Sequence, residues 1–287
     1  MAVTNLGWET GLVYRFWMAA AVAALAAPAD SQAPAPRPAL TYADLADVVL
    51  KAPVVAHVRV AESDRLSPAQ APGLAAGRTR FFIQADVVSL VRGAQGLPQR
   101  VRYLADLPNE SGRPPRLAKK GEFLIMAAPV AGRPGELRLV NPDAQLPYGR
   151  AEADRLRAIL QEAIRPEAAP AIIGIGKAFH VPGTLPGESE TQIFLQGADQ
   201  RPLSLNILRR PGEVPSWSVA LSEIVDEAAG APRRDTLLWY RLACTLPARL
   251  PQQSLAEADP EQAKAIEADY RLVMQQLGPC TRARPRR

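Results

Sequence analysis

The sequence predicts a mostly β protein of the α+β class: an N-terminal five-stranded barrel flanked by helices, then a small β-sandwich or barrel with a C-terminal helix. Many short segments alternate apolar and polar residues, as half-buried strands do, whereas only three repeat apolar residues at helical spacing. The 28 prolines, roughly twice the average usage, divide the chain with turns. With 47% hydrophobic residues, the 287-residue chain has apolar material for one large domain or two ordinary ones.

The first predicted element is a helix. Thr41 and Asp44 have the spacing of a capping box, and apolar residues follow at helical spacing up to Pro53. The next segment, 54–61, alternates as a half-buried strand does, with valine and alanine side chains on one face. His57 falls on the other face, so we expect it to face solvent rather than to bind a ligand.

Four more strands and a helix complete the predicted barrel. The segment at 79–91 is long enough to require a bend or a bulge. The helix, from about Arg150 to Ile164, carries its apolar residues on one face and stops at Pro166. The remaining strands are expected at 101–105, 123–128 and 137–139.

The second half of the chain predicts another β unit. Asp259 followed by Pro260 is typical of a helix start, and the helix is expected to end at Gly278 and to pack on this unit. Five short strands, separated by turns such as Pro-Gly, are expected before it at 172–181, 192–196, 203–208, 217–221 and 236–244.

The order of patterns in residues 41–145 resembles that of the netrin-like and metalloproteinase-inhibitor-like barrels, which have an OB-type architecture. The resemblance rests on 46–49, the alternating strand 54–60, the segment 121–127, and the long strand 81–93, which ends in a basic residue and glycine. It implies an OB-like barrel fold. In that inhibitor family an N-terminal cysteine chelates the target's zinc, but no cysteine precedes Cys244 here, so inhibition is not implied.

The N-terminal region predicts export. Twelve apolar residues, Phe16 to Ala27, follow Arg15 and are too few for a bilayer core, which needs about 20 residues, but they fit the hydrophobic region of a signal peptide. Small residues predict cleavage after Ala29, with 24–26 as a second choice. An uncleaved membrane anchor and a buried cytosolic helix are the alternatives. Because the first twelve residues contain no lysine or arginine, a start at Val13 is a further hypothesis.

Composition then divides the chain into five parts. We expect a periplasmic or secreted protein with no membrane span after removal of the signal. The parts are a signal peptide at 1–29, a proline-rich linker at 30–40, an OB-like barrel domain at 41–165, a second β-domain with a C-terminal helix at 170–280, and a basic tail at 281–287.

Export would bring the two cysteines into an oxidising compartment, where an even number favours a disulfide. Cys244 and Cys280 would then close a loop of about 36 residues, worth about 3 to 4 kcal/mol in the chain-entropy model. Two unpaired buried thiols are the alternative, because sequence alone does not bring them together.

The charges do not point to nucleic acid. The formal net charge is +5, but four arginines lie within the last six residues, and 5 minus 4 leaves +1 for the rest. We therefore expect no specific nucleic-acid partner. The basic tail is expected to stay solvated, where it would contact phosphates or acidic lipid head groups, or simply fray.

Motifs of catalysis are missing from the sequence. It lacks G-x-S-x-G, H-E-x-x-H and C-x-x-C patterns, and Gly174 to Lys177 fits neither a phosphate loop nor a dinucleotide fingerprint. Two histidines and two cysteines are too few for a histidine-rich zinc site or a cysteine cluster. We expect no cofactor and no metal. His180, before a Pro-Gly turn, is the weak catalytic candidate, with Glu188, Ser189 and Glu190 following; a solvated loop histidine is the simpler interpretation.

Other residues suggest binding. The loop 107–117 is irregular and rich in proline, and its Arg113 and Arg116 are candidates for recognition. Trp217 and Trp239 would suit a sugar-stacking platform, but aromatic residues in apolar segments are more often core. The acidic pairs Glu188 with Glu190 and Asp226 with Glu227 suit acid–base chemistry only if they face a cleft, and charged turns explain them more simply.

Together these observations predict an exported cell-envelope binding or adaptor protein without catalytic activity, whose partner is an envelope protein or a polymer. One alternative is an envelope hydrolase with a dispersed Ser-His-acid site near His180. Another is a structural envelope subunit that pairs through the edges of its sheets.

Overall fold

The computed structural model describes residues 39–221 and 230–284. The predicted signal peptide, its cleavage site at Ala29 and most of the linker lie outside the described residues. So do Asp226, Glu227 and the last three residues of the basic tail. The description that follows concerns the unit formed by residues 39–287.

The first sheet closes into the predicted five-stranded barrel. Its strands follow the order β1-β2-β3-β5-β4, and β4 pairs back onto β1, with Val54 opposite Ala127. A short sixth strand, β6, which the sequence did not predict, is added beyond β4. The bounds are β1 Val54–Arg65, β2 Arg78–Arg92, β3 Arg100–Pro108, β4 Glu122–Pro129, β5 Glu136–Leu139 and β6 Gln145–Pro147.

The predicted bulge lies on the long strand β2. In its pairing with β1, Val58 is opposite Val87 and His57 is opposite Ser89, so Val88 has no partner. Val91 is skipped in the same way, and a third irregularity skips Ala61 on β1. An extra residue on one strand increases the local twist and bends that strand. The bend lets fifteen residues follow the curved wall of a small barrel.

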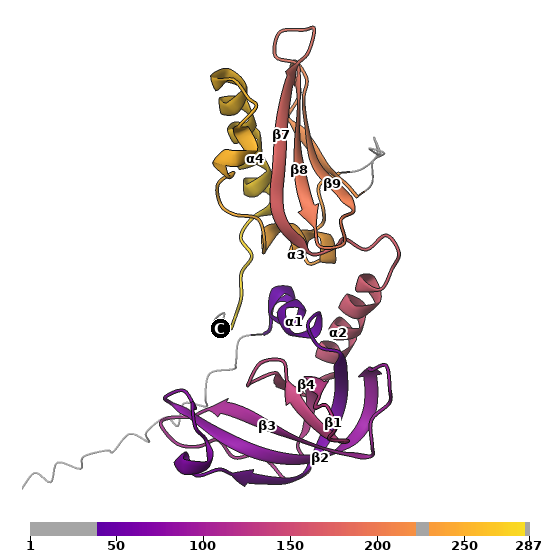
Figure 1. Ribbon diagram of the computed structural model, residues 1–287, viewed down its shortest axis with the longest axis vertical. Coiled ribbons are helices and arrows are strands. Elements are labelled where there is room, and N and C mark those ends of the chain that lie inside the picture. Colours follow the sequence, from indigo (N-terminus) through magenta and orange to yellow (C-terminus); the bar gives the residue numbers. More distant parts are fainter. Residues whose placement is uncertain (1–38, 222–229, 285–287) are drawn as a thin grey trace, which may run out of the picture. The chain divides into compact units, whose positions relative to one another are not determined.

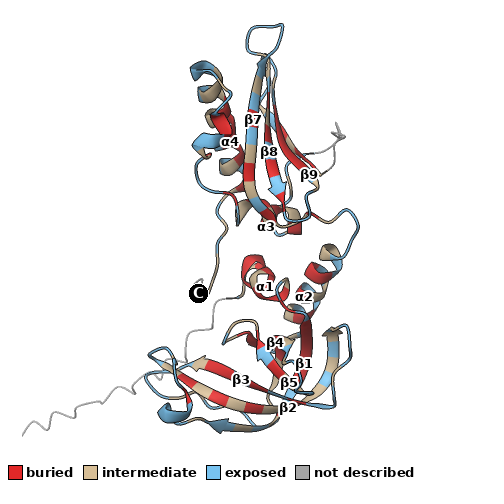
Figure 2. Ribbon diagram, in the orientation of Figure 1, coloured by how far each residue is buried: buried red, intermediate tan, exposed pale blue. Residues whose placement is uncertain are grey.

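Two helices lie beside the barrel, α1 (Tyr42–Val49) and α2 (Arg150–Ala163), and Figure 2 shows their buried residues. The capping box expected at the start of α1 is present: the Thr41 hydroxyl accepts from the Asp44 amide, and the Asp44 carboxylate accepts from the Thr41 amide at 2.9 Å. α1 ends four residues before Pro53 rather than reaching it. Leu45 and Val49 are completely buried on one side of α1, which leaves another side for polar residues.

The second sheet has four antiparallel strands in the order β10-β9-β8-β7 (Figure 1). The C-terminal helix, α4 (Pro260–Leu277), packs against it, and it begins at Asp259 and Pro260 as predicted. The strand bounds are β7 Ile172–Pro182, β8 Ser189–Gly197, β9 Pro202–Arg209 and β10 Ser216–Ala220.

The expected fifth strand at 236–244 is wrong, because this segment forms helix α3 (Leu237–Ala243). Its sequence is almost continuously apolar, and such a run does not distinguish a strand from a buried helix by its period. Thr236 caps the helix by accepting from the Trp239 amide. α3 contacts both α1 and α2, so its apolar side chains are buried on more than one side of the helix.

Two short 3-10 helices complete the described chain, η1 (Pro68–Gln70) and η2 (Gln252–Leu255). Among the helices of residues 39–221 and 230–284, none is both long enough and apolar enough to cross a membrane.

Candidate functional site

The chain beyond α4 crosses to α1 instead of ending in solvent. We call residues 279–284 the C-terminal arm. Gly278 ends α4 with a φ of 68°, a left-handed conformation that glycine adopts without a steric cost. Two residues later, Cys280 forms a disulfide with Cys244 at the end of α3, with 5.1 Å between the Cα atoms. The predicted disulfide is therefore confirmed, and it anchors the start of the arm.

Beyond the disulfide, Arg282 binds α1. Its Nε lies 2.6 Å from Asp47 Oδ2 and its Nη2 3.1 Å from Asp47 Oδ1, a paired geometry that suits guanidinium and carboxylate. The hydroxyl of Tyr240 on α3 donates to the same carboxylate at 2.7 Å. The expectation of a solvated basic tail is wrong for Arg282, whose side chain is only 11% exposed, because a carboxylate on α1 is within its reach.

The arm also binds the first turn of α1 through its backbone. The carboxylate of Asp44 accepts from the amides of Ala283 at 2.9 Å and Arg284 at 3.1 Å. Burial raises the pKa of Asp44, but hydrogen bonds from Thr41 and from these two arm amides outweigh it and hold the pKa below its ordinary value. The carboxylate therefore stays ionised and joins the arm to the start of α1.

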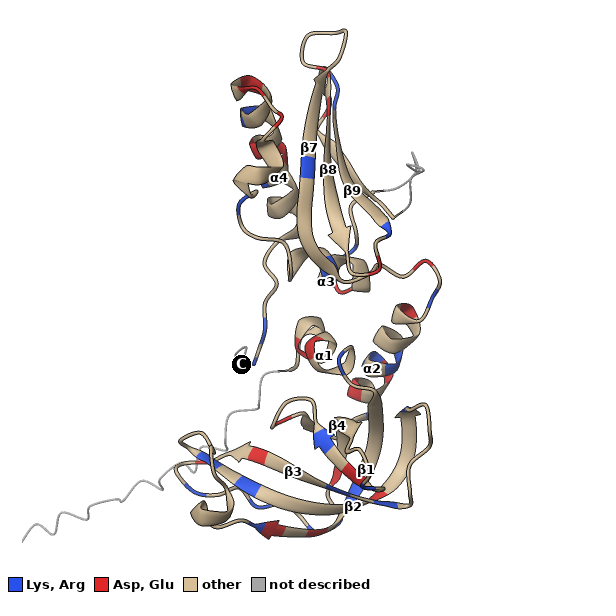
Figure 3. Ribbon diagram, in the orientation of Figure 1, with Lys and Arg blue, Asp and Glu red and all other residues tan. Residues whose placement is uncertain are grey.

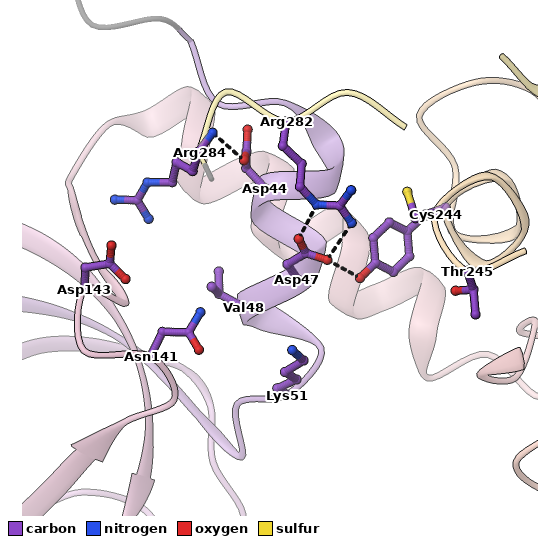
Figure 4. Close-up of a pocket in the computed structure, with 11 residues that line it drawn as sticks. Asp44, Asp47, Val48, Lys51, Asn141, Asp143, Cys244, Thr245, Arg282 and Arg284 are labelled. Carbon is purple, nitrogen blue, oxygen red and sulfur yellow. Dashed lines mark hydrogen bonds and ion pairs between the residues drawn. The ribbon is translucent and has the colours of Figure 1, made fainter. Parts of the chain in front are cut away.

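A pocket of about 310 Å³ opens where the arm, α1, α3 and the turn before β6 meet (Figure 4). This volume is at the lower end of the range of small-molecule sites. Among the residues that the structure describes, its charged lining is balanced, with three carboxylates and three cations: Asp44, Asp47, Asp143, Lys51, Arg282 and Arg284. Figure 3 shows the acidic residues of α1 and the basic residues of the arm.

The carboxylates of the pocket already have partners. Asp47 binds Arg282 and Tyr240, Asp44 binds the arm amides, and Asp143 pairs with Arg78 at 3.3 Å. Within residues 39–221 and 230–284, by contrast, the charged groups of Lys51 and Arg284 take part in no ion pair. Figure 4 shows Lys51, from the turn after α1, and Asn141, from the facing turn, extending toward the same space. The charged groups left for a ligand are the two cations Lys51 and Arg284, and Asn141 adds an amide that can donate beside them.

The sequence held one signal for this site that its interpretation missed. Asp44 and Asp47 recur at i and i+3, so they share one face of α1, and Lys51, at i+7, follows two residues after its last helical residue. That spacing predicts a charged stripe. Its partners, Asn141, Asp143 and the arm, lie far away in the sequence, and no local pattern brings them to the stripe.

His180 lies within β7 rather than in a loop. Its Nδ1 is 2.8 Å from the hydroxyl of Thr191, its partner on β8, and that hydroxyl donates to Asp269 Oδ2 on α4 at 2.5 Å. Arg209 donates to the other oxygen of Asp269. Thr191 and Asp269 are 0% and 1% exposed, so the cluster joins β7 and β8 to α4 beneath the surface.

The acidic residues that follow His180 do not meet it. Glu188 accepts hydrogen bonds from the amides of Thr184 and Leu185 and so stabilises the turn between β7 and β8. Ser189 and Glu190 pair with Pro182 and Val181 in the ladder. The histidine thus contacts a threonine hydroxyl. Glu188, Ser189 and Glu190, the candidates for a dispersed catalytic site with it, are held elsewhere on the same hairpin.

His57 is a second correction: it is 7% exposed instead of facing solvent. Tyr148, which follows the unpredicted strand β6, stacks on its ring with 3.7 Å between centroids and 7° between planes. His57 Nε2 lies 2.9 Å from Glu122, which also binds Arg59. The alternation placed His57 on the correct face, but it gave no sign that β6 would bring an aromatic ring over that face.

Trp217 and Trp239 are core residues. Trp217 is 5% and Trp239 3% exposed, and their indole nitrogens donate to Gln276 and to the carbonyl of Leu277. They stabilise the packing of α4 and do not form a stacking platform.

The candidate recognition loop is an ordered surface turn. Ser111 and Gly112 adopt positive φ values of 51° and 76°, and the backbones of Glu110 and Arg113 form two hydrogen bonds across the turn. Arg113 and Arg116 are both exposed. Their role in recognition stays a prediction.

The chain matches no protein-family model, and no curated protein is similar to it. In the described ranges, 39–221 and 230–284, histidine, cysteine and acidic side chains form no group of three that would suit a metal ion.

Proposed function

We propose that this chain is an exported binding or adaptor protein of the cell envelope, periplasmic or secreted, that binds its ligand in the pocket beside the C-terminal arm and has no catalytic activity. The observation that carries the proposal is how the pocket is built. One wall is the arm, and the arm starts at the Cys244–Cys280 disulfide. Because disulfides persist in oxidising compartments, such a wall suits a protein that works outside the cytosol.

The chemistry of the lining supports binding rather than turnover. Its carboxylates are engaged by a guanidinium, a tyrosine hydroxyl and backbone amides, which hold them in fixed positions. A general base or nucleophile would instead need a free group within hydrogen-bond reach of a substrate. Fixed charges around a small cavity are typical of a site that orients a ligand.

The experiment that tests this proposal follows export and disulfide formation together. The full chain is produced with a C-terminal epitope tag in a Gram-negative host, the cells are fractionated, and thiols are alkylated before reduction. We expect the protein in the periplasmic fraction with both cysteines protected. A cytosolic protein with two reactive thiols would overturn the proposal. In the same fractions, crosslinking and affinity recovery identify an envelope partner.

A further inference from the structure

We propose that the pocket binds a small molecule through one oxyanion group, a carboxylate or a phosphate, held by Lys51, Arg284 and Asn141. This inference rests on the proposed function, since it names the class of ligand for the same site. It follows from three properties of the pocket: the donors left over, the placement of those donors, and the volume together with the charge balance of the lining.

The first property is the balance of donors and acceptors. Asp47 accepts from Arg282 and Tyr240, and Asp44 accepts from two arm amides. Asp143 pairs with Arg78. A lysine ammonium and a guanidinium carry only donors, and an amide carries two more. A ligand that meets Lys51, Arg284 and Asn141 must therefore supply acceptors, and an oxyanion supplies them together with the opposite charge.

The second property is placement. Lys51 follows the end of α1, Asn141 lies in the turn between β5 and β6, and Arg284 is in the arm. Figure 4 shows that the three side chains come from separate segments around one space. Donors on different sides of one pocket suit the several oxygens of a carboxylate or phosphate, whereas a single surface lysine would not fix an orientation.

The third property limits the ligand to a small molecule. The volume of about 310 Å³ is that of a compact ligand. Asp44, Asp47 and Asp143 also line the pocket, so the six charged groups among its described lining residues sum to zero. One added negative charge meets the two cations that have no ion-pair partner among the described residues, but a polyanion would also meet three carboxylates. We therefore infer a small organic anion or phosphate and not a nucleic acid.

The test uses the purified protein with its disulfide formed and its predicted signal peptide removed. This protein is titrated with inorganic phosphate and with succinate at low ionic strength. Binding is followed by calorimetry and by the side-chain amide resonance of Asn141 in ¹H–¹⁵N spectra. We expect saturable binding of at least one probe in the millimolar range or tighter, with a shift of that resonance. Binding of only one of the two probes would show whether the site prefers a phosphate or a carboxylate.

Two variants locate the binding. Lys51→Gln and Arg284→Gln each remove one positive charge, and we expect each to weaken binding about tenfold or more. The matched control is Lys119→Gln, which removes the same charge from an exposed position in the loop before β4 and should change the affinity less than twofold. All four proteins should have the same circular dichroism spectrum and unfolding midpoint, because Lys51 is exposed and the Arg284 guanidinium forms no ion pair with described residues.

The inference is overturned if the wild-type protein binds neither phosphate nor succinate at probe concentrations tenfold above the millimolar range. It is also overturned if Lys51→Gln and Arg284→Gln bind the probes as the wild type does. Either result leaves export and the disulfide untouched, because those are measured in cells. Conversely, a cytosolic protein would remove the proposed function while the titration could still succeed. The two failures are thus distinguishable.

Discussion

Arg282 reaches back 235 positions along the chain to Asp47 and binds it through two nitrogens, at 2.6 and 3.1 Å. This pair links the last described segment to the first helix. The Tyr240 hydroxyl shares the carboxylate, so three separate elements meet at one side chain. Asp47 therefore contributes both to the stability of the fold and to the geometry of the pocket.

Removing the guanidinium should destabilise the fold and loosen the arm. We expect Arg282→Ala to lower the free energy of unfolding by about 1 to 3 kcal/mol, the usual cost of losing charged hydrogen bonds. The cost should stay below that of a fully buried pair because the Asp47 side chain is 27% exposed. Urea denaturation of the oxidised protein measures it.

The control for that variant is Arg157→Ala, which breaks an exposed pair with Asp154 on α2. Exposed pairs contribute little, so a change within about 0.5 kcal/mol is expected. Equal losses in the two variants would show that the Arg282 pair behaves as an ordinary surface contact.

The disulfide should contribute more than the ion pair. Replacing both cysteines, as Cys244→Ser with Cys280→Ser, removes a constraint on a 36-residue loop of the unfolded chain. The chain-entropy model gives a loss of about 3 to 4 kcal/mol. A reducing agent should lower the unfolding midpoint of the wild type to that of the double variant and leave the variant unchanged. A wild type that is insensitive to reduction would contradict the prediction.

Acid should release the arm from α1. The pKa of Asp44 is lowered in the folded state, whereas in the unfolded chain it lies near its ordinary value of about 3.9. At pH 6 to 7 both states are ionised and the contribution to stability is complete. As the pH falls through about 4, the unfolded chain binds the proton first, and the contribution is lost progressively down to the folded pKa.

Asp44→Asn provides the measurement. The difference in unfolding free energy between wild type and variant should be largest near neutral pH and should shrink between pH 5 and pH 3. A difference that stays constant over this range would mean that the Asp44 carboxylate does not titrate with folding. A peptide-amide exchange experiment would show faster exchange at Ala283 and Arg284 in the variant.

The His180 cluster is expected to be structural. Thr191→Val keeps the shape of a fully buried side chain but removes the hydroxyl between His180 and Asp269. We expect a loss of about 1 to 3 kcal/mol, because buried polar groups are left with fewer partners. Thr191→Ser, which retains the hydroxyl, should recover part of that loss in thermal or urea unfolding. If both variants were equally stable, the hydroxyl would have no structural role.

Local signals in the sequence were enough for much of the fold. The capping residues Thr41 and Asp259 marked helix starts correctly because a cap depends only on neighbours within one turn. Strand alternation located most strands of both sheets for the same reason. A strand was predicted at 236–244 because these residues are apolar at nearly every position, whereas the structure has a helix there that Thr236 caps and that contacts α1, α2 and α4.

The pocket required information that no local pattern contains. The charged stripe of α1 is readable from spacing, but Arg282 is brought to Asp47 by a disulfide and by the end of α4. His57 illustrates the same limit, since a three-residue strand decides that Tyr148 covers it. Long-range pairings of this kind are set by the packing of the whole chain and not by the sequence around each residue.

The hydroxyl of Thr41 donates to the carbonyl of Thr281 at 3.1 Å, although the two residues are 240 positions apart. Thr41 is also the N-cap of α1, and Asp44, its partner in the capping box, accepts from the amides of Ala283 and Arg284. The same two side chains therefore start the helix and hold the arm. Fraying of the first turn of α1 and release of the arm are thus one cooperative event.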